Sequence, residues 1–248
     1  MLRDRIRPFI PRKIRKWRHA VYVAKNATYN ADGMMTVHDA DFMHDPLFQE
    51  AYRVGKETGS WGLSELPWRT YIACWAGRHA LELVGDFVEC GVNRGGISRA
   101  VMHYINFQSN TGRRFFLLDT FCGFPPELSH LATTANLHDY DECYEQVCET
   151  FRDFSNVSII RGAIPATLPQ VDCEKIAWLH LDMNVAEPEV AAADFFWDRL
   201  VPGAVVLLDD YGFGKPYWRQ KEAMDKFAAS RSTRVLLLPT GQGMMIKS

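Results

Sequence analysis

The chain has 248 residues, 47% of them apolar and 23% charged, with a formal net charge of −2 at pH 7. This composition is ordinary for a globular protein with one large core, and the near-neutral charge excludes a global attraction to nucleic acid or membranes. No apolar run approaches the ~20 residues of a membrane span. Charges interrupt the N-terminus, so no secretory signal is expected. None of the six cysteines forms a CxxC pair, which argues against a zinc site and favours core cysteines in a reducing cytoplasm.

The N-terminus is strongly basic. Eight lysines and arginines but only one acidic residue, Asp4, occur in the first eighteen positions, and apolar residues such as Ile14 and Trp17 are interleaved among them. Such an arm could bind an anionic membrane surface, an acidic polymer or a partner subunit, or it could pack on its own domain. We predict a basic arm with an irregular or helical extension over residues 1–60 and one main domain over residues 61–248.

From residue 67 the sequence alternates between helix and strand patterns. Apolar residues at helical spacing predict helices over 67–84, 95–107, 140–154, 188–200 and 218–229. Short apolar runs predict strands over 86–92, 113–121, 156–162, 175–183 and 203–212, followed by a closing pair after residue 233. Apolar strands separated by helices indicate a parallel sheet that is covered on both faces. We therefore predict an α/β fold with a doubly wound, mostly parallel, seven-stranded sheet and an antiparallel hairpin at the C-terminus.

Acidic residues end four of the five predicted parallel strands. Glu89 and Asp119 end the first two, Asp182 ends the fourth, and Asp209 and Asp210 end the fifth. Ligands of such sheets bind outside the carboxyl ends of the strands. Asp182, Asp209 and Asp210 could converge on Mg²⁺ or a similar dication if the fifth strand has just ended. The alternative is that one aspartate caps the next turn and the other is exposed to solvent.

The turn after the first strand reads "ECGVNRGG", residues 89–96. It lacks the GxGxxG pattern of nicotinamide-binding folds, but its glycines allow the backbone to approach a ligand closely. The helix that follows offers free N–H groups at its start. Asp119 is placed to hold ribose hydroxyls or, alternatively, to cap a loop.

Five motifs occur in a characteristic order: "GDFVECGVNRGG", "LLDTFCGFP", "IAWLHLDMNVAEPEV", "PGAVVLLDDYG" and "KEAMDKF". With these, the chain from Leu66 to the C-terminus resembles the macrocin O-methyltransferase (TylF-like) family. Its members are class I S-adenosylmethionine-dependent enzymes that methylate sugar hydroxyls of natural products and glycans. The resemblance implies a small-molecule or glycan acceptor, and we expect a homo-oligomer that does not bind nucleic acid.

The resemblance also implies roles for individual residues. S-adenosylmethionine would contact residues from four strand ends, and Mg²⁺ would be bound by the three aspartates. For the methionine moiety these residues are Glu89, Gly91, Arg94 and Ser98; for the ribose and adenine they are Asp119, Phe121, Gly162 and Ala163; Asp182 would serve both the cofactor and the metal, with Asp209 and Asp210 completing the metal site.

One departure from the family pattern concerns the general base. The family carries Asp-x-Asp where this chain has Asp182-Met183-Asn184, and the neutral amide of Asn184 cannot accept the hydroxyl proton. His138 is the candidate replacement, with His130 and Asp139 as alternatives. A metal could instead lower the hydroxyl pKa enough for water to accept the proton, or turnover could be altered or lost.

Further features concern the acceptor. The loop 123–139 could form a lid, and Tyr211, Tyr217 and Trp218 could form an aromatic platform for a sugar or simply pack the base of a helix. We predict a magnesium-dependent sugar O-methyltransferase. The alternatives are a methyltransferase for a phenol, carboxylate or amine, a nicotinamide-dependent oxidoreductase, and a protein that binds the cofactor without turnover.

Overall fold

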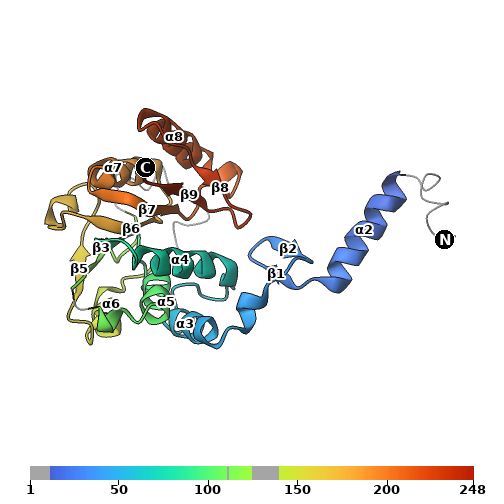
Figure 1. The fold of residues 1–248 in the computed structure, drawn as a ribbon, viewed down its shortest axis with the longest axis horizontal. Helices are drawn as coiled ribbons and strands as arrows, with labels where there is room; N and C mark the ends of the chain where they lie inside the picture. Colours follow the sequence, from blue (N-terminus) through green and yellow to red (C-terminus); the bar gives the residue numbers. More distant parts are fainter. Residues whose placement is uncertain (1–11, 111, 125–139) are drawn as a thin grey trace.

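A seven-stranded sheet forms the centre of the molecule (Figure 1). The computed structural model describes residues 12–110, 112–124 and 140–248. The strand order is β5-β4-β3-β6-β7-β9-β8, in which the first five strands are parallel and β9 runs antiparallel to both β7 and β8. This topology confirms the predicted doubly wound α/β fold with its C-terminal hairpin. The strands are β3 (Asp86–Cys90), β4 (Phe115–Asp119), β5 (Val157–Arg161), β6 (Ile176–Leu181), β7 (Leu200–Leu208), β8 (Leu236–Leu237) and β9 (Gly243–Ile246).

Helices cover both faces of this sheet (Figure 1). One face carries α4 (Pro67–Ala80), α5 (Gly96–Tyr104) and α6 (Tyr144–Phe151), and the other carries α7 (Ala186–Trp197) and α8 (Trp218–Ser230). Successive strand residues point to opposite faces. Phe87 of β3 therefore packs under the first group of helices, whereas Val88 packs under the second. The inner strands β3, β4 and β6 are thus buried on both sides, as their continuous apolar sequences predict, whereas the edge strand β5 is only partly buried.

The fifth parallel strand differs from its predicted bounds. β7 begins at Leu200 and ends at Leu208, so it starts and ends earlier than the predicted range 203–212. Pro202, which precedes the predicted range, and Gly203, which begins it, both lie within the strand at a shift in its register with β6. Because β7 ends at Leu208, Asp209 and Asp210 follow the strand and are free to turn toward the same point.

The N-terminal part is more regular than its sequence suggested. It contains α2 (Arg12–Asn26), the two-stranded sheet of β1 (Tyr29–Ala31) and β2 (Met34–Thr36), and α3 (Pro46–Glu57). Asp45 caps α3 by accepting a hydrogen bond of 3.0 Å from Leu47 N, and Pro46 fills the first helical position. We predicted no bounds for these elements.

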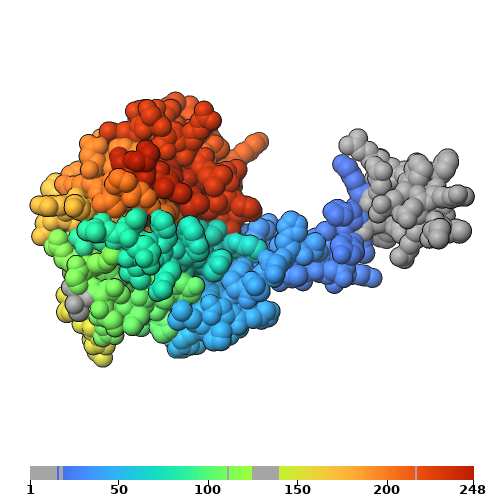
Figure 2. Space-filling view, in the orientation of Figure 1, coloured from blue at the N-terminus to red at the C-terminus, as the bar shows by residue number. Residues whose placement is uncertain are grey.

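An aromatic cluster joins residues 29–48 to the main part of the chain. Phe42 stacks on Tyr71 of α4 with ring centroids 4.3 Å apart, and it also meets Trp68 edge-on. By contrast, α2 projects away from the rest of the molecule, joined to it through β1 and β2 (Figures 1 and 2). The basic residues before Arg12 lie outside the described residues, so the partner of the arm and the homo-oligomer stay predictions.

None of the helices in the described ranges is long and apolar enough to cross a membrane.

Candidate active site

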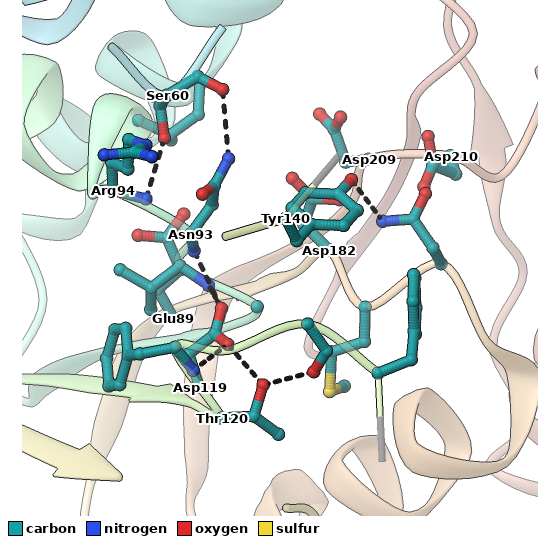
Figure 3. A pocket seen from close by; sticks show the side chains of 18 of the residues that line it. Ser60, Glu89, Asn93, Arg94, Asp119, Thr120, Tyr140, Asp182, Asp209 and Asp210 are labelled. Atoms are coloured by element: carbon teal, nitrogen blue, oxygen red, sulfur yellow. Dashed lines mark hydrogen bonds between the residues drawn. The ribbon is translucent and has the colours of Figure 1, made fainter. Parts of the chain in front are cut away.

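A cavity of about 690 Å³ opens at the carboxyl ends of the parallel strands. Its wall includes the turns after β3 and β4, the ends of β6 and β7, and the segment before α4 (Figure 3). The predicted cofactor residues Gly91, Arg94, Phe121, Gly162 and Ala163 all line it. So do Glu89, Asp119, Asp182, Asn184, Asp209 and Asp210. The sheet topology therefore brings nearly all of the predicted site residues into one cavity.

The turn after β3 passes very close to β6. Gly91 has a φ of +88°, and a Cβ at this position would lie 1.8 Å from the carbonyl oxygen of Asp182. Only glycine fits here. The close approach holds the first turn directly against the end of the strand that carries Asp182.

Asp119 holds two turns together. Its Oδ2 accepts hydrogen bonds from Val92 N at 2.6 Å and Asn93 N at 2.7 Å. Its Oδ1 accepts from Phe121 N at 2.8 Å and from the Thr120 hydroxyl at 3.2 Å. A carboxylate can accept about four hydrogen bonds, so these four donors occupy all of its acceptor sites. Asp119 is therefore a loop cap in this structure, and its contact with a ribose stays a prediction.

The segment before α4 supports the same turn from outside. Ser60 Oγ accepts a hydrogen bond from Arg94 N at 3.1 Å, and Ser60 O accepts one from Asn93 Nδ2 at 3.0 Å. The Arg94 side chain bonds to Gln146 of α6. Ser60 and the neighbouring Trp61 both line the cavity. The extension thus contributes part of the wall around the predicted methionine site.

Glu89 and Asp209 face the same buried histidine. The Ser98 hydroxyl donates to Glu89 Oε2, and Glu89 Oε1 lies 2.8 Å from His180 Nδ1. On its other side, His180 Nε2 lies 3.7 Å from Asp209 Oδ1. Burial alone would lower the pKa of His180, but the neighbouring carboxylates of Asp209 and Glu89 outweigh it and raise the pKa to about 10. His180 thus lies between one carboxylate from each half of the cavity, and this pKa favours its charged form.

Asp182, Asp209 and Asp210 form the acidic cluster (Figure 3). Each offers one carboxylate oxygen, and these oxygens all lie within 4.8 Å of one another. Burial, followed by the charge of Asp209, raises the pKa of Asp182 well above its ordinary value. Burial and the charges of Asp182 and Asp209 do the same to the pKa of Asp210. The three side chains converge, as the sequence predicted.

The members of the acidic cluster differ in their partners. Asp209 Oδ2 accepts a hydrogen bond from Arg69 Nη1 at 2.6 Å, and Asp209 Oδ1 accepts one from Gln242 Nε2 at 3.0 Å. Burial opposes the charge of Asp209, yet Arg69 and His180 lower its pKa. By contrast, Asp210 Oδ2 is buried with no hydrogen-bond partner. A buried, unpaired carboxylate oxygen is costly unless a cation or donor meets it.

Asn184 lies beside this cluster in a left-handed conformation, with a φ of 59°, which asparagine tolerates better than most residues. Its Nδ2 donates a hydrogen bond of 3.4 Å to the hydroxyl of Tyr140. Burial and the charges of Asp182 and Asp210 raise the pKa of Tyr140, so this hydroxyl stays protonated. The candidate bases His130, His138 and Asp139 lie outside the described residues.

The predicted aromatic platform forms only in part. Tyr217 lines the cavity, together with Phe213, which the sequence analysis did not single out. The hydroxyl of Tyr211 bonds to Asp225 and Lys221 of α8. Trp218 is the first residue of α8, is 55% exposed and does not line the cavity.

Sequence reasoning missed several residues of the site, chiefly Arg69, His180, Tyr140 and Ser60. For two of them, His180 and Arg69, the sequence contains a pattern that could have indicated a role in the site. His180 is a polar residue in an apolar strand, two positions before Asp182, and Arg69 lies in the first turn of a largely buried helix. Buried charged groups usually have a partner. Tyr140 and Ser60 carry no such signal, because they lie in loops whose paths the sequence does not indicate.

A family model described as macrocin O-methyltransferase (TylF) matches residues 73–236. A curated relative from Streptomyces olivaceus, 8-demethyl-8-(2,3-dimethoxy-alpha-L-rhamnosyl)-tetracenomycin-C 4'-O-methyltransferase, is 30% identical over 138 residues, covering 51% of this chain and 53% of the relative. Mycinamicin III 3''-O-methyltransferase from Micromonospora griseorubida is 27% identical over 140 residues, covering 51% and 55%. The matches therefore span about half the length of these relatives.

A solved structure described as the O-methyltransferase NovP has a TM-score of 0.63 at 20% identity, and the match covers 84% of this chain and 97% of that chain. At this identity the similarity shows a shared fold.

Proposed function

Because the chain belongs to the macrocin O-methyltransferase family, we propose that it transfers a methyl group from S-adenosylmethionine to a sugar hydroxyl of a glycoside, glycan or natural product, with Mg²⁺ or a similar dication. The similar curated relatives have names that describe O-methyl transfer, and one of them names a rhamnosyl group. The observation that carries the proposal is one cavity with a glycine-rich turn on one side and the acidic cluster on the other.

The donor set of the acidic cluster fits a hard dication. Carboxylate oxygens are the ligands that Mg²⁺ prefers. The oxygen of Asp210 that lacks a hydrogen-bond partner is the kind of group that an ion would satisfy. Asp182, Asp209 and Asp210 would hold the ion, which would polarise an acceptor hydroxyl and stabilise the alkoxide that forms from it.

The opposite side of the cavity suits the methyl donor. Gly91 allows close approach of the backbone, and the buried carboxylate of Glu89 lies near the predicted methionine site. Carboxylates outnumber cations on the cavity wall, which favours a ligand that carries a sulfonium charge. Methyl transfer needs the acceptor oxygen in line with the methyl–sulfur bond, so the main work of these residues is positioning.

Position 184 offers no carboxylate that could remove the proton from the acceptor hydroxyl. The Asn184 amide and the protonated Tyr140 hydroxyl can bind and orient an acceptor oxygen, but neither accepts its proton at neutral pH. We infer that these two groups hold the acceptor while the proton leaves to water or to a residue outside the described ranges.

A direct experiment tests the proposal. Purified protein is incubated with methyl-labelled S-adenosylmethionine and a panel of rhamnosides, phenols and carboxylates, with either Mg²⁺ or a chelator. We expect label on a sugar hydroxyl, and at least a hundredfold loss with chelator, since a metal contributes several kcal/mol to such a step. Label on a phenol or carboxylate alone would replace the sugar assignment.

A second candidate follows from Asn184 itself, because a protein without the family carboxylate could bind the donor and turn over slowly or not at all. Asn184→Asp restores the Asp-x-Asp pattern. If proton removal limits turnover, this variant should be faster by about 100-fold, the lower range for general base catalysis. Wild-type protein that binds S-adenosylhomocysteine but methylates nothing, together with an active Asn184→Asp variant, would establish this candidate.

A further inference from the structure

Arg69 links the N-terminal extension to the acidic cluster. Its Nε and Nη2 donate to Asp32 at 2.7 and 2.9 Å, and its Nη1 donates to Asp209 Oδ2 at 2.6 Å. Its side chain is only 11% exposed. The guanidinium thus forms a two-bond fork with one carboxylate and a single bond with another, a geometry that lysine cannot reproduce.

The position of Asp32 is set by the hairpin that carries it. Asp32 lies in the turn between β1 and β2 with a φ of 51°. The hairpin is anchored to α4, because Tyr29 packs edge-on against Trp68 and its hydroxyl accepts a 3.3 Å hydrogen bond from Trp68 N. Asp32 is therefore part of a packed element and approaches Arg69 from a fixed direction.

The other surroundings of Arg69 leave it little freedom. Its guanidinium carbon lies 4.7 Å from the centre of the Phe213 ring, and it lines the same cavity as the acidic cluster. The Asp209 oxygen that it contacts is one of the few acidic oxygens there with a full positive charge beside it. A dication bound by the cluster would lie close to this fixed charge and would be repelled by it.

We propose that Arg69 is a positioning residue that serves as a built-in counter-cation of the acidic cluster, and that Asp32 moderates its charge, so that the pair sets how strongly the cluster binds a dication. This inference rests on the proposed function in one respect, namely that the cluster binds an ion. Arg69 would keep Asp209 oriented while the site lacks an ion, and would weaken the binding of that ion.

Two substitutions should then change ion affinity in opposite directions. Arg69→Met keeps an apolar stem but removes the cation, so Mn²⁺, used as the probe, should bind about tenfold more tightly. Asp32→Asn leaves the cation less compensated, so Mn²⁺ should bind about threefold more weakly. Calorimetry or the paramagnetic signal of free Mn²⁺ measures both affinities.

The stability of the ion-free protein gives a second readout. In chelator, Arg69→Met removes the guanidinium that Asp32 and Asp209 share, and its Tm should fall by roughly 5–15 °C. Saturating Mn²⁺ should raise the Tm of this variant more than that of wild type. Arg113→Met is the matched control, because Arg113 is part-buried but donates to main-chain oxygens of Ala80, Leu81, Leu83 and Gly85 away from the cluster. It should lose stability with no change in Mn²⁺ affinity.

Arg69→Lys covers the case in which Arg69→Met does not fold. Lysine keeps the positive charge but cannot make the two parallel hydrogen bonds to Asp32. The Mn²⁺ affinity of this variant should therefore stay near the wild-type value. Arg69→Met with unchanged or weaker Mn²⁺ binding would overturn the inference, as would tighter binding by Asp32→Asn or no Mn²⁺ binding by any variant. A parallel titration with S-adenosylhomocysteine separates the two proposals, because a wild-type protein that does not bind it has lost the proposed function regardless of Arg69.

Discussion

The two halves of the cavity differ in how completely their polar groups are satisfied. On the side of β3 and β4, the Asp119 carboxylate has four donors, and Ser60 holds the backbone of the first turn in place. On the side of β6 and β7, three carboxylates crowd together, and one oxygen of Asp210 has no hydrogen-bond partner.

This difference shows which half is complete without a ligand. The turns near β3 are held by backbone hydrogen bonds and by glycines, which makes a rigid wall that can be filled without rearrangement. The acidic cluster holds a buried carboxylate oxygen without a hydrogen-bond partner and gains most from a bound cation. The predictions below test this contrast, from the largest expected effect to the smallest.

Gly91→Ala should disrupt the rigid half most severely. The new Cβ would collide with the carbonyl of Asp182, so the first turn and β6 must separate. We expect a loss of more than about 4 kcal/mol in the free energy of unfolding, in the range of the most damaging single substitutions. Urea denaturation and S-adenosylhomocysteine binding both measure it.

Gly33→Ala is the control for this prediction. Gly33 also has a positive φ, of +73°, but a Cβ there meets nothing within 4 Å. It should cost only about 1–2 kcal/mol, the usual penalty of a left-handed conformation. Equal losses in the two variants would mean that conformation, and not the contact with Asp182, fixes the turn.

Asp210→Asn tests the half of the cavity that contains the acidic cluster. Because this substitution removes the cost of burying a carboxyl group beside two others, the variant should be more stable than wild type in chelator by about 1–2 kcal/mol. Methyl transfer should fall by about 100-fold or more, since the metal site loses a ligand. Chemical unfolding in chelator and the methyl-transfer assay provide the two measurements.

Asp86→Asn serves for comparison. Asp86 lies at the opposite end of β3, where its Oδ1 accepts a hydrogen bond of 2.8 Å from Arg114 N. Its carboxylate has partners, so its replacement should lower stability and leave Mn²⁺ binding intact. If Asp210→Asn instead behaved like Asp86→Asn, the acidic cluster would be an ordinary paired site.

His180→Gln should weaken the connection between the halves. The imidazole of His180 lies between Glu89 and Asp209, and its raised pKa favours the charged form, which glutamine cannot supply to either carboxylate. Breaking such buried pairs should cost about 3 kcal/mol of stability. It should also reduce any gain in S-adenosylhomocysteine affinity that Mn²⁺ gives the wild type, as measured by calorimetry with and without the ion. A gain of the same size in both proteins would show that His180 does not couple the two sites.

Glu189→Gln tests how the stability of the protein depends on pH. Burial raises the pKa of Glu189 from 4.5 to about 7, although it accepts hydrogen bonds from Gln220 Nε2 and Met183 N. The folded state therefore binds a proton that the unfolded state has released between these values, and stability falls as pH rises through them. Wild type should lose about 2 kcal/mol relative to Glu189→Gln between about pH 5 and about pH 7.5. If the free energies of unfolding of wild type and Glu189→Gln changed equally with pH, the raised pKa of Glu189 would be refuted.

Much of the fold follows from local patterns in the sequence. Continuous apolar strands that alternate with helices predict the parallel sheet, and the topology alone then brings the residues that follow β3, β4, β6 and β7 to one edge. The convergence of Asp182, Asp209 and Asp210 was predictable for this reason. The family resemblance added which ligands to expect, while the ligand contacts themselves stay predictions.

The parts of the site that could not be predicted depend on contacts between segments that lie far apart in the sequence. Arg69 and Asp32 lie on elements whose packing rests on aromatic contacts rather than on sheet topology, and no pattern in the sequence indicates that they meet. His180 stands out as a polar residue in an apolar strand, but strand alternation assigns it only to a sheet face and does not indicate its partners. The N-terminal helices α2 and α3 were given no bounds, although with 15 and 12 residues they are as long as the helices that cover the sheet.

Asp209 accepts hydrogen bonds from Arg69, 140 residues earlier in the sequence, and from Gln242, 33 residues later. Contacts between segments far apart in the sequence form slowly during folding. We therefore expect this carboxylate to gain its complete set of donors only after α4 has docked against the carboxyl end of β7.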